Sequence, residues 1–191
     1  MQKMVKKRKS ATKMLSGWSK SVNRMPVNSA LHDVCDRDDL ETVQRLISAD
    51  PHAGECLGKF DRTPLHVAAK RGSVSICKAL LDAVHPDQLS SHLSLSTSHG
   101  FSVLYCAVLS GSTDLVQFLA SSSSQYPIDL EAGDLGGLRP LHIAAEKGYP
   151  GIVQTLVLAG CDPAATDSIG RTALDWARAK GHEECVSLLL L

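Results

Sequence analysis

The sequence is short of several features that would identify whole classes of protein. No stretch of about 20 consecutive apolar residues occurs in its 191 residues, so nothing predicts a membrane-spanning helix. The first 25 residues contain no Asp or Glu, although they hold eight of the 20 Lys and Arg residues. The rest of the chain therefore carries 12 basic against 20 acidic groups, a net charge of −8. This imbalance excludes a uniformly basic body, and we expect no direct nucleic-acid binding.

Closely spaced cysteines are also missing. None of the six cysteines lies within 20 residues of another, which excludes the two-residue spacings of zinc and redox motifs. They are too sparse for a disulfide-stapled secreted domain, and the N-terminus lacks the apolar core of a secretory signal. We therefore expect reduced thiols that act as small buried hydrophobes, in a protein of the cytoplasm, the nucleus or both.

What the sequence does contain is self-similarity. Four segments align without gaps over ten residues, each with a leucine followed seven residues later by glycine. A weaker fifth copy has Asp38 in place of that glycine. The leucines are spaced by 34, 39, 37 and 33 residues, which predicts a repeated structural unit. They are Leu31, Leu65, Leu104, Leu141 and Leu174.

Each copy has the pattern of two short helices. A hydroxyl residue and often a proline stand where the first helix would begin, as at Thr63 and Pro64. A glycine such as Gly72 stands where it would end, because a left-handed backbone costs least at glycine. A second apolar segment follows, and polar stretches rich in Gly, Asp and Pro separate the copies as turns.

This pattern resembles the ankyrin repeat. The resemblance is carried by Thr63-Pro64-Leu65-His66, Arg139-Pro140-Leu141-His142 and Ala159-Gly160-Cys161-Asp162-Pro163. It covers residues 28–191 and implies an all-α solenoid of about five stacked helix-turn-helix units with connecting hairpins. The implied units are residues 28–60, 61–98, 99–135, 136–167 and 168–191. The resemblance also implies that His66 and His142 bond backbone groups between units.

The copies depart from the family pattern in several places. Tyr105 and Asp175 stand where the family has histidine, and Arg139 replaces a capping hydroxyl, so we expect that helix start to be weaker. Two connections exceed the repeat length, by six residues through 89–98 and by four through 121–127. Because added loop length costs little, we expect both to be surface loops, either neutral or specific to a partner.

Catalytic chemistry finds no support in the sequence. Gly-x-Ser-x-Gly, His-Glu-x-x-His and a phosphate loop ending in Gly-Lys-Ser/Thr are all absent. The glycines at 133–137 fall between units, residues 182–185 lack a second pair of metal ligands, and Trp176 occupies a core position of the repeat. We expect no catalytic residue, cofactor, metal or small-molecule substrate, and no cavity of about 300 Å³ or more.

A repeated unit exposes equivalent positions along one surface, so function is expected there. In the ankyrin pattern these are the hairpin tips and the two residues before the helix-ending glycine. Apolar groups within a charged rim predict a protein-binding patch, unless the apolar side chains fold back on their own units. The candidate partner-binding residues are Phe60, Arg62, Lys70, Arg71, Phe101, Leu109, Leu135, Leu138, Glu146 and Lys147. We expect a non-enzymatic adaptor, scaffold or regulator that binds a protein or peptide with acidic character beside an apolar anchor.

Residues 1–27 are expected to form a basic, largely disordered arm. Lys6, Lys7, Arg8 and Lys9 resemble a nuclear-import signal. Apolar residues from Ala11 to Met25 recur at helical spacing, which is typical of a basic helix that binds calmodulin or an anionic membrane. The sequence does not choose between a solvated tail, an import signal and such a helix. At the other end, the terminal leucines are expected to meet further chain, a partner or a second copy.

Overall fold

The structure, a computed structural model, describes residues 29–50, 54, 57–122 and 125–190. The basic arm and its import-like residues Lys6, Lys7, Arg8 and Lys9 lie outside the described residues. Within them, the chain forms helices and no strand, apart from an isolated bridge between Thr166 and Thr172. No helix of this part is long and apolar enough to cross a membrane.

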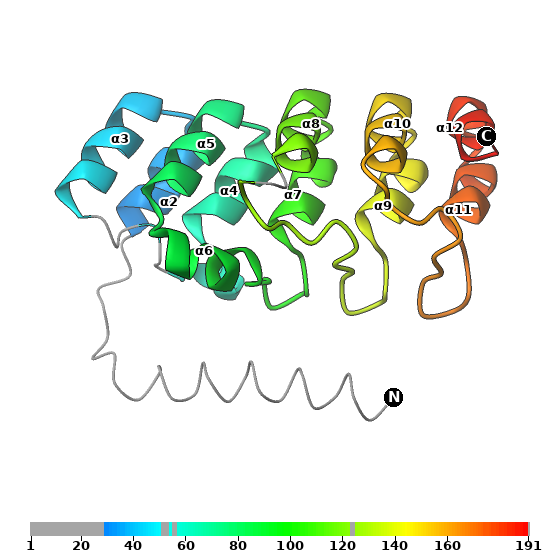
Figure 1. Cartoon of the computed structure of the whole chain (residues 1–191), viewed down its shortest axis with the longest axis horizontal. Helices are drawn as coiled ribbons and strands as arrows, with labels where there is room; N and C mark the ends of the chain where they lie inside the picture. The colour runs from blue at the N-terminus through cyan, green and yellow to red at the C-terminus, as the bar shows by residue number, and fades with distance from the viewer. Residues whose placement is uncertain (1–28, 51–53, 55–56, 123–124, 191) are drawn as a thin grey trace.

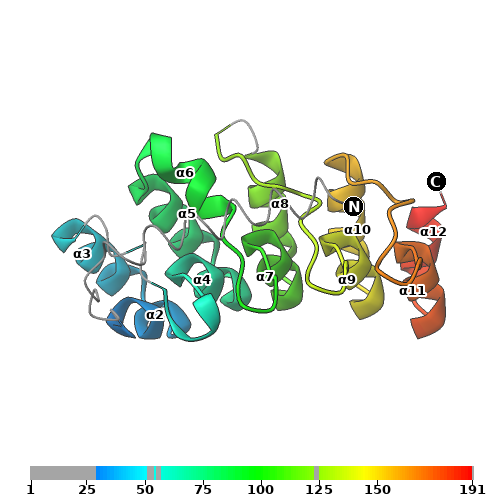
Figure 2. The same ribbon diagram turned by 90° about the horizontal axis from the view of Figure 1, so that it is seen from below.

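The helices stack in two layers (Figures 1 and 2). One layer, called here the first helices, runs beside the connecting loops, and the other, the second helices, covers it. Adjacent members of each layer pack together along the stack. The first helices are α2 (Ser29–Asp36), α4 (Pro64–Arg71), α7 (Val103–Ser110), α9 (Pro140–Lys147) and α11 (Ala173–Lys180). The second helices are α3 (Leu40–Ala49), α5 (Val74–Ala83), α8 (Thr113–Ser121), α10 (Pro150–Leu158) and α12 (Glu183–Leu189). The predicted all-α solenoid is confirmed.

The predicted capping residues begin three of the first helices. The hydroxyls of Thr63, Ser102 and Thr172 each accept a hydrogen bond from the backbone N–H three residues later. Such caps satisfy amides that have no partner within the helix. The side chain of Arg139 makes no such cap. The start of α9, which was expected to be weaker, therefore has no hydroxyl acceptor. Instead, the Arg139 N–H donates to Nδ1 of His142 at 3.1 Å.

The first helices end in a left-handed residue, as predicted. Gly72, Gly111, Gly148 and Gly181 have φ between 69° and 79°. In the weakest copy Asp38 adopts φ 60°, because Asp tolerates this conformation better than most residues with a side chain. At Gly148 a side chain would also collide with its neighbour, since an added Cβ would lie 2.6 Å from the His182 ring.

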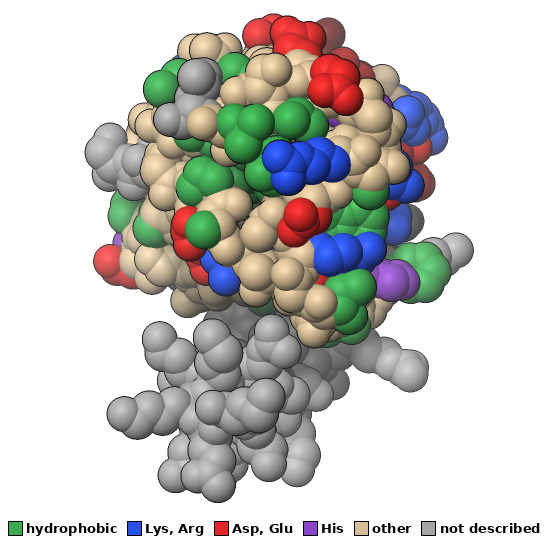
Figure 3. Space-filling model, turned by 90° about the vertical axis from the view of Figure 1, so that its right-hand side faces the viewer, with side chains coloured by type: hydrophobic (Ala, Val, Ile, Leu, Met, Phe, Trp, Pro, Cys, Tyr) green, Lys and Arg blue, Asp and Glu red, His purple; other side chains and the backbone are tan. Residues whose placement is uncertain are grey.

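The core runs along the whole stack between the two layers. Four of the repeated leucines are buried, whereas Leu174 in α11 is only half-buried. The five cysteines among the described residues are free and buried, which confirms that these five act as small hydrophobes. Burial raises the pKa of Cys35 to about 12 and that of Cys106 to about 11, so both thiols stay neutral. Figure 3 looks onto the C-terminal end of the stack, where apolar side chains lie among charged ones and Leu190 is exposed.

The connection through residues 89–98 is not simply a loop, and that prediction was wrong. It contains most of an additional helix, α6 (Pro86–Leu93), which begins with a proline in its first turn. Leu89 and Leu93, four residues apart and therefore on one face, are buried against the core. Tertiary packing of these two leucines outweighs the polar, serine-rich character of the segment.

The second long connection, residues 121–127, is anchored to the adjacent helices by Tyr126, which follows its run of serines. Tyr126 is buried, and its hydroxyl donates a hydrogen bond to Asp82 at the end of α5. Its ring packs at a tilt against Phe118, with the ring centres 6.1 Å apart. This connection is therefore fastened to both adjacent second helices, α5 and α8.

Candidate functional site

An open depression of about 650 Å³ lies on the loop side of α2, α4 and α7. The expectation that no cavity of such size would occur was wrong. The eight-residue first helices are short, and Gly58, Arg62 and Phe101 from the connecting loops wall off the space beside them. The remaining lining comes from the helices: His32, Asp33, Asp36, His66, Val67, Lys70, Arg71, Cys106 and Leu109.

The apolar part of the depression is held in place by aromatic stacking. Phe101 is half-buried and stacks on Tyr105, with ring centres 4.6 Å apart and planes at 6°. The Tyr105 hydroxyl donates to Asp134 of the next hairpin at 3.0 Å. Tyr105 thus makes an inter-unit bond at the position where the family has histidine. The partly exposed side chains of Val67 and Leu109 complete this apolar surface.

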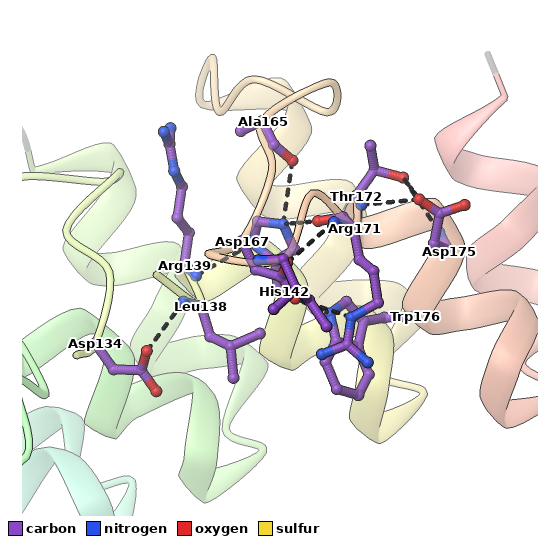
Figure 4. A network of polar contacts seen from close by, with 11 residues as sticks. Asp134, Leu138, Arg139, His142, Ala165, Asp167, Arg171, Thr172, Asp175 and Trp176 are labelled. Carbon is purple, nitrogen blue, oxygen red and sulfur yellow. Dashed lines mark hydrogen bonds and ion pairs between the residues drawn. The ribbon is translucent and has the colours of Figure 1, made fainter. Parts of the chain in front are cut away.

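The repeat histidines differ in what they bond. Nε2 of His142 donates to the carbonyl oxygens of Ala165 and Arg171 at 3.1 and 3.2 Å, which confirms the inter-unit role implied for it (Figure 4). Nδ1 of His66 accepts the Thr63 N–H, whereas its Nε2 makes no hydrogen bond of good geometry with a described residue and interacts only weakly with the backbone of Phe101 and Leu95 on the next connection. Desolvation by burial lowers the pKa of His66 to about 4, so this ring is neutral at physiological pH.

An ion pair joins neighbouring units at the rim of the depression. Nε and Nη2 of Arg71 donate to the two carboxylate oxygens of Asp36 at 2.8 and 2.7 Å. The hydrogen bonds from Arg71 lower the pKa of Asp36, and Asp36 raises that of Arg71. Lys70 is exposed beside this pair, and the Arg62 guanidinium lies 5.5 Å from the centre of the Phe60 ring.

Exposed apolar side chains gather at the tips of the hairpins. Phe60 is 57% exposed and sits in a left-handed turn with φ 62°, while Leu135 and Ile169 are 71% and 70% exposed. Backbone hydrogen bonds join successive hairpins, from Ser98 N–H to Phe60 O, from Leu135 N–H to His99 O, and from Ser168 N–H to Gly136 O. The tips therefore form one connected row rather than independent loops.

The last hairpin is braced by a buried carboxylate (Figure 4). Asp167 accepts hydrogen bonds from the Arg171 guanidinium at 3.0 Å and from the Trp176 indole N–H at 3.1 Å. Arg171 also lies 3.7 Å from the centre of the Trp176 ring. The hydrogen bonds to Asp167 outweigh its desolvation and lower its pKa to about 2. Trp176 is half-buried against the core, so it packs as predicted and also holds the hairpin.

The candidate partner-binding residues fall into four places. Arg62, Lys70, Arg71, Phe101 and Leu109 line the depression. Phe60 and Leu135 stand at hairpin tips, whereas Leu138 packs against the core. Glu146 and Lys147 lie farther along on α9, where Glu146 is 3.9 Å from Lys147 and 3.6 Å from Lys180.

Sequence reasoning left out several residues that line the depression. Val67 and Cys106 occupy the same repeat position, and that shared position was the one available signal for them. His32 and Asp33 belong to the weakest copy, which offered no such signal. Among the described residues, no group of three or more His, Cys, Asp or Glu side chains is placed to hold a metal ion.

Comparison with known protein families assigns this architecture. Models of ankyrin repeats match residues 31–134 (three copies) and 124–177 (many copies), and a model of the single ankyrin repeat matches 169–191. The chain belongs to the ankyrin-repeat family. The ankyrin repeat is a non-catalytic module that generally mediates protein–protein interaction, and this chain consists of such repeats over most of its length.

The relatives that the chain matches are much longer proteins. The chain is 30% identical over 162 residues to palmitoyltransferase AKR1 of Lachancea kluyveri, covering 85% of this chain and 21% of that protein. It is 32% identical over 154 residues to ankyrin repeat protein nuc-2 of Neurospora crassa, covering 80% and 13%. It is 30% identical over 128 residues to Neurogenic locus notch homolog protein 1 of Xenopus laevis, covering 67% and 5%. The chain thus spans about a fifth or less of each of these relatives.

Proposed function

We propose that the chain is a non-enzymatic adaptor, scaffold or regulator that binds a protein partner on the loop side of its first helices and on its hairpin tips. One observation carries the proposal: the depression and the row of exposed apolar tips lie on the same side of the stack. A protein surface that combines an apolar centre with a charged rim is typical of a binding patch. The proposal includes a basic arm of residues 1–27, a repeat domain of residues 28–191, and a cytoplasmic or nuclear location.

The test compares variants that carry the same substitutions on opposite layers. The chain with Leu109→Glu and Lys70→Glu changes the depression, and the chain with Leu158→Glu and Lys78→Glu changes the second helices. Leu158 is 80% exposed on α10 and Lys78 is exposed on α5, so the control pair makes the same chemical change at exposed positions. Each chain is used as bait in a cell lysate after circular dichroism has confirmed its fold.

Partners lost from the first variant and retained by the second support the proposal. Partners retained by both variants, or lost equally from both, contradict it. Loss from the control alone would move the binding surface to the second helices.

A second candidate function rests on the charge distribution of the sequence. Eight of the 20 Lys and Arg residues lie in the first 25 residues, without a single acid. We propose as the alternative that this arm binds calmodulin or an anionic membrane and that the repeats are its rigid base. Sedimentation with phosphatidylserine vesicles and titration with calmodulin test it, using the chain with and without residues 1–25. Binding that survives removal of the arm, or no binding by the intact chain, contradicts this alternative.

A further inference from the structure

The charges around the depression do not all remain available to a partner. Asp36 and Arg71 satisfy each other through two hydrogen bonds, in the two-pronged geometry that arginine makes with a carboxylate. Both side chains come from the rim, Asp36 from α2 and Arg71 from α4. Together they add no net charge, and their main role is to join two neighbouring units.

The charges that are left favour an anion. Lys70 projects from the last turn of α4 and makes no salt bridge within 4 Å with any described residue, although its charge helps to lower the pKa of Asp36. Arg62 on the adjacent hairpin faces the Phe60 ring, which is attracted to the guanidinium but does not neutralise it. Asp33 on α2 is the opposing acid in the lining. Two positive charges thus face one negative charge, a net of about one positive charge next to the apolar surface.

The equivalent surface farther along the stack is different. Glu146 occupies on α9 the repeat position that Lys70 has on α4. Its carboxylate lies within 4 Å of both Lys147 and Lys180, so a carboxylate ligand there would compete with Glu146 for these two lysines. An acidic ligand therefore meets less competition for Lys70 in the depression than for Lys147 and Lys180 farther along the stack.

The apolar part of the depression has room for a side chain. Val67, Phe101 and Leu109 are all partly exposed in the lining, so an apolar group placed there removes their surfaces from water. Cys106 is buried among them, and burial keeps its thiol neutral by raising its pKa to about 11. The lining therefore presents an apolar surface directly beside Lys70.

We propose that the depression binds an acidic peptide segment, with one aliphatic or aromatic side chain against Val67, Phe101 and Leu109 and a carboxylate beside Lys70. This inference rests on the proposed function and names the chemistry of the partner. Lys70 is the charge that recognises the carboxylate, supported by Arg62. The Asp36–Arg71 pair is a structural clasp and does not contribute to recognition.

A selection from random peptides tests this assignment and needs no identified partner. A library of random 16-residue peptides displayed on phage is selected on the full chain, and the enriched peptides are synthesised with a fluorescein label. Their affinities are then measured by fluorescence anisotropy for the full chain and for four variants. The variants are Lys70→Gln, Lys78→Gln, Leu109→Ser, and the double variant Asp36→Asn with Arg71→Gln.

We expect enriched peptides in which Asp or Glu lies within a few residues of an apolar residue. Lys70→Gln should weaken their binding about fivefold or more, and Leu109→Ser about tenfold. Lys78→Gln, which removes the same charge from the second helix of the same repeat, should change the affinity less than twofold. The double variant also preserves the net charge of the depression, so its affinity should fall less than twofold. Binding should weaken between about 0.1 M and 1 M salt, because salt screens the contact with Lys70.

Each other result overturns the assignment in a distinguishable way. Enriched peptides that are basic or purely apolar, or acidic peptides indifferent to Lys70→Gln, contradict the acidic partner. If those peptides still lose affinity with Leu109→Ser, the proposed function survives. Equal losses from the double variant and Lys70→Gln contradict the clasp role of Asp36 and Arg71. If no peptide loses affinity with Leu109→Ser, both the inference and the binding surface are refuted.

Discussion

Replacing Gly148 by alanine provides a stringent test of how the units are joined. Gly148 ends α9 with φ 69°, and Gly181 ends α11 with φ 74°. Alanine at either position is forced into a left-handed backbone, at a cost of about 1–2 kcal/mol. At Gly181 the new methyl group would meet no described atom within 4 Å, beyond its chain neighbours. At Gly148 it would lie 2.6 Å from the ring of His182 in the following unit.

The difference between the two variants isolates this contact. To admit the methyl group, the His182 ring must move and give up the hydrogen bond from Nε2 to the Glu146 carbonyl, which is 3.1 Å long. Losing a hydrogen bond of this kind costs about 0.5–1.5 kcal/mol. We therefore expect Gly148→Ala to destabilise the chain by about 1.5–3.5 kcal/mol and Gly181→Ala by about 1–2 kcal/mol, a difference of about 0.5–1.5 kcal/mol.

Urea unfolding measured by fluorescence checks these values. The sequence has two tryptophans, so a Trp18→Phe background leaves Trp176 in α11 as the one reporter. Both substitutions lie at ends of helices that pack directly against each other. Equal free energies of unfolding for the two variants, or a larger loss for Gly181→Ala, would refute the close approach of His182 to Gly148.

Three further substitutions, one of them with a matched control, test other parts of the fold. Leu104→Ala should cost about 2–5 kcal/mol because Leu104 is fully buried, whereas Leu158→Ala, at an exposed site, should stay within about 0.5 kcal/mol in urea titrations. Tyr105→Phe removes the hydroxyl bond to Asp134 and should cost about 1 kcal/mol by the same assay. The pKa of His66 is about 4 in the folded chain, against a reference value of 6.5. The contribution of neutral His66 to the free energy of unfolding is therefore complete above pH 6.5 and declines as the pH falls to 4. His66→Gln should reduce the pH dependence of the free energy of unfolding between pH 4 and 6.5. An unchanged pH dependence would contradict the lowered pKa of His66.

The repeated helices could be predicted because their signals are local. Thr63 accepts a bond from its own helix, Pro64 fits its first turn, and Gly72 supplies the left-handed residue that ends it. Each of these effects operates within one turn of helix and can therefore be recognised from the order of residues. Helix α6 could not be predicted in this way, because Leu89 and Leu93 stabilise it only through contact with a core built by distant segments.

The candidate site was predictable in part for the same physical reason. The repeat register places Lys70 and Leu109 at equivalent positions of two units, and both line the depression. The depression itself depends on how three units and two hairpins pack, which no local pattern encodes. Asp36 and Arg71 are 35 residues apart in the sequence, so only the structure shows that they pair and that their charges are not available to a partner.

Site-directed photo-crosslinking tests the central claim most directly. The photoreactive residue p-benzoylphenylalanine replaces Leu109 in the depression in one chain and Leu158 on α10 in another. Both chains are irradiated in lysate from cells that express the protein, and crosslinked proteins are identified by mass spectrometry. The account predicts a discrete protein adduct from position 109 that is absent from position 158. Adducts from position 158 alone, or the same adducts from both positions, would contradict binding on the loop side of the first helices.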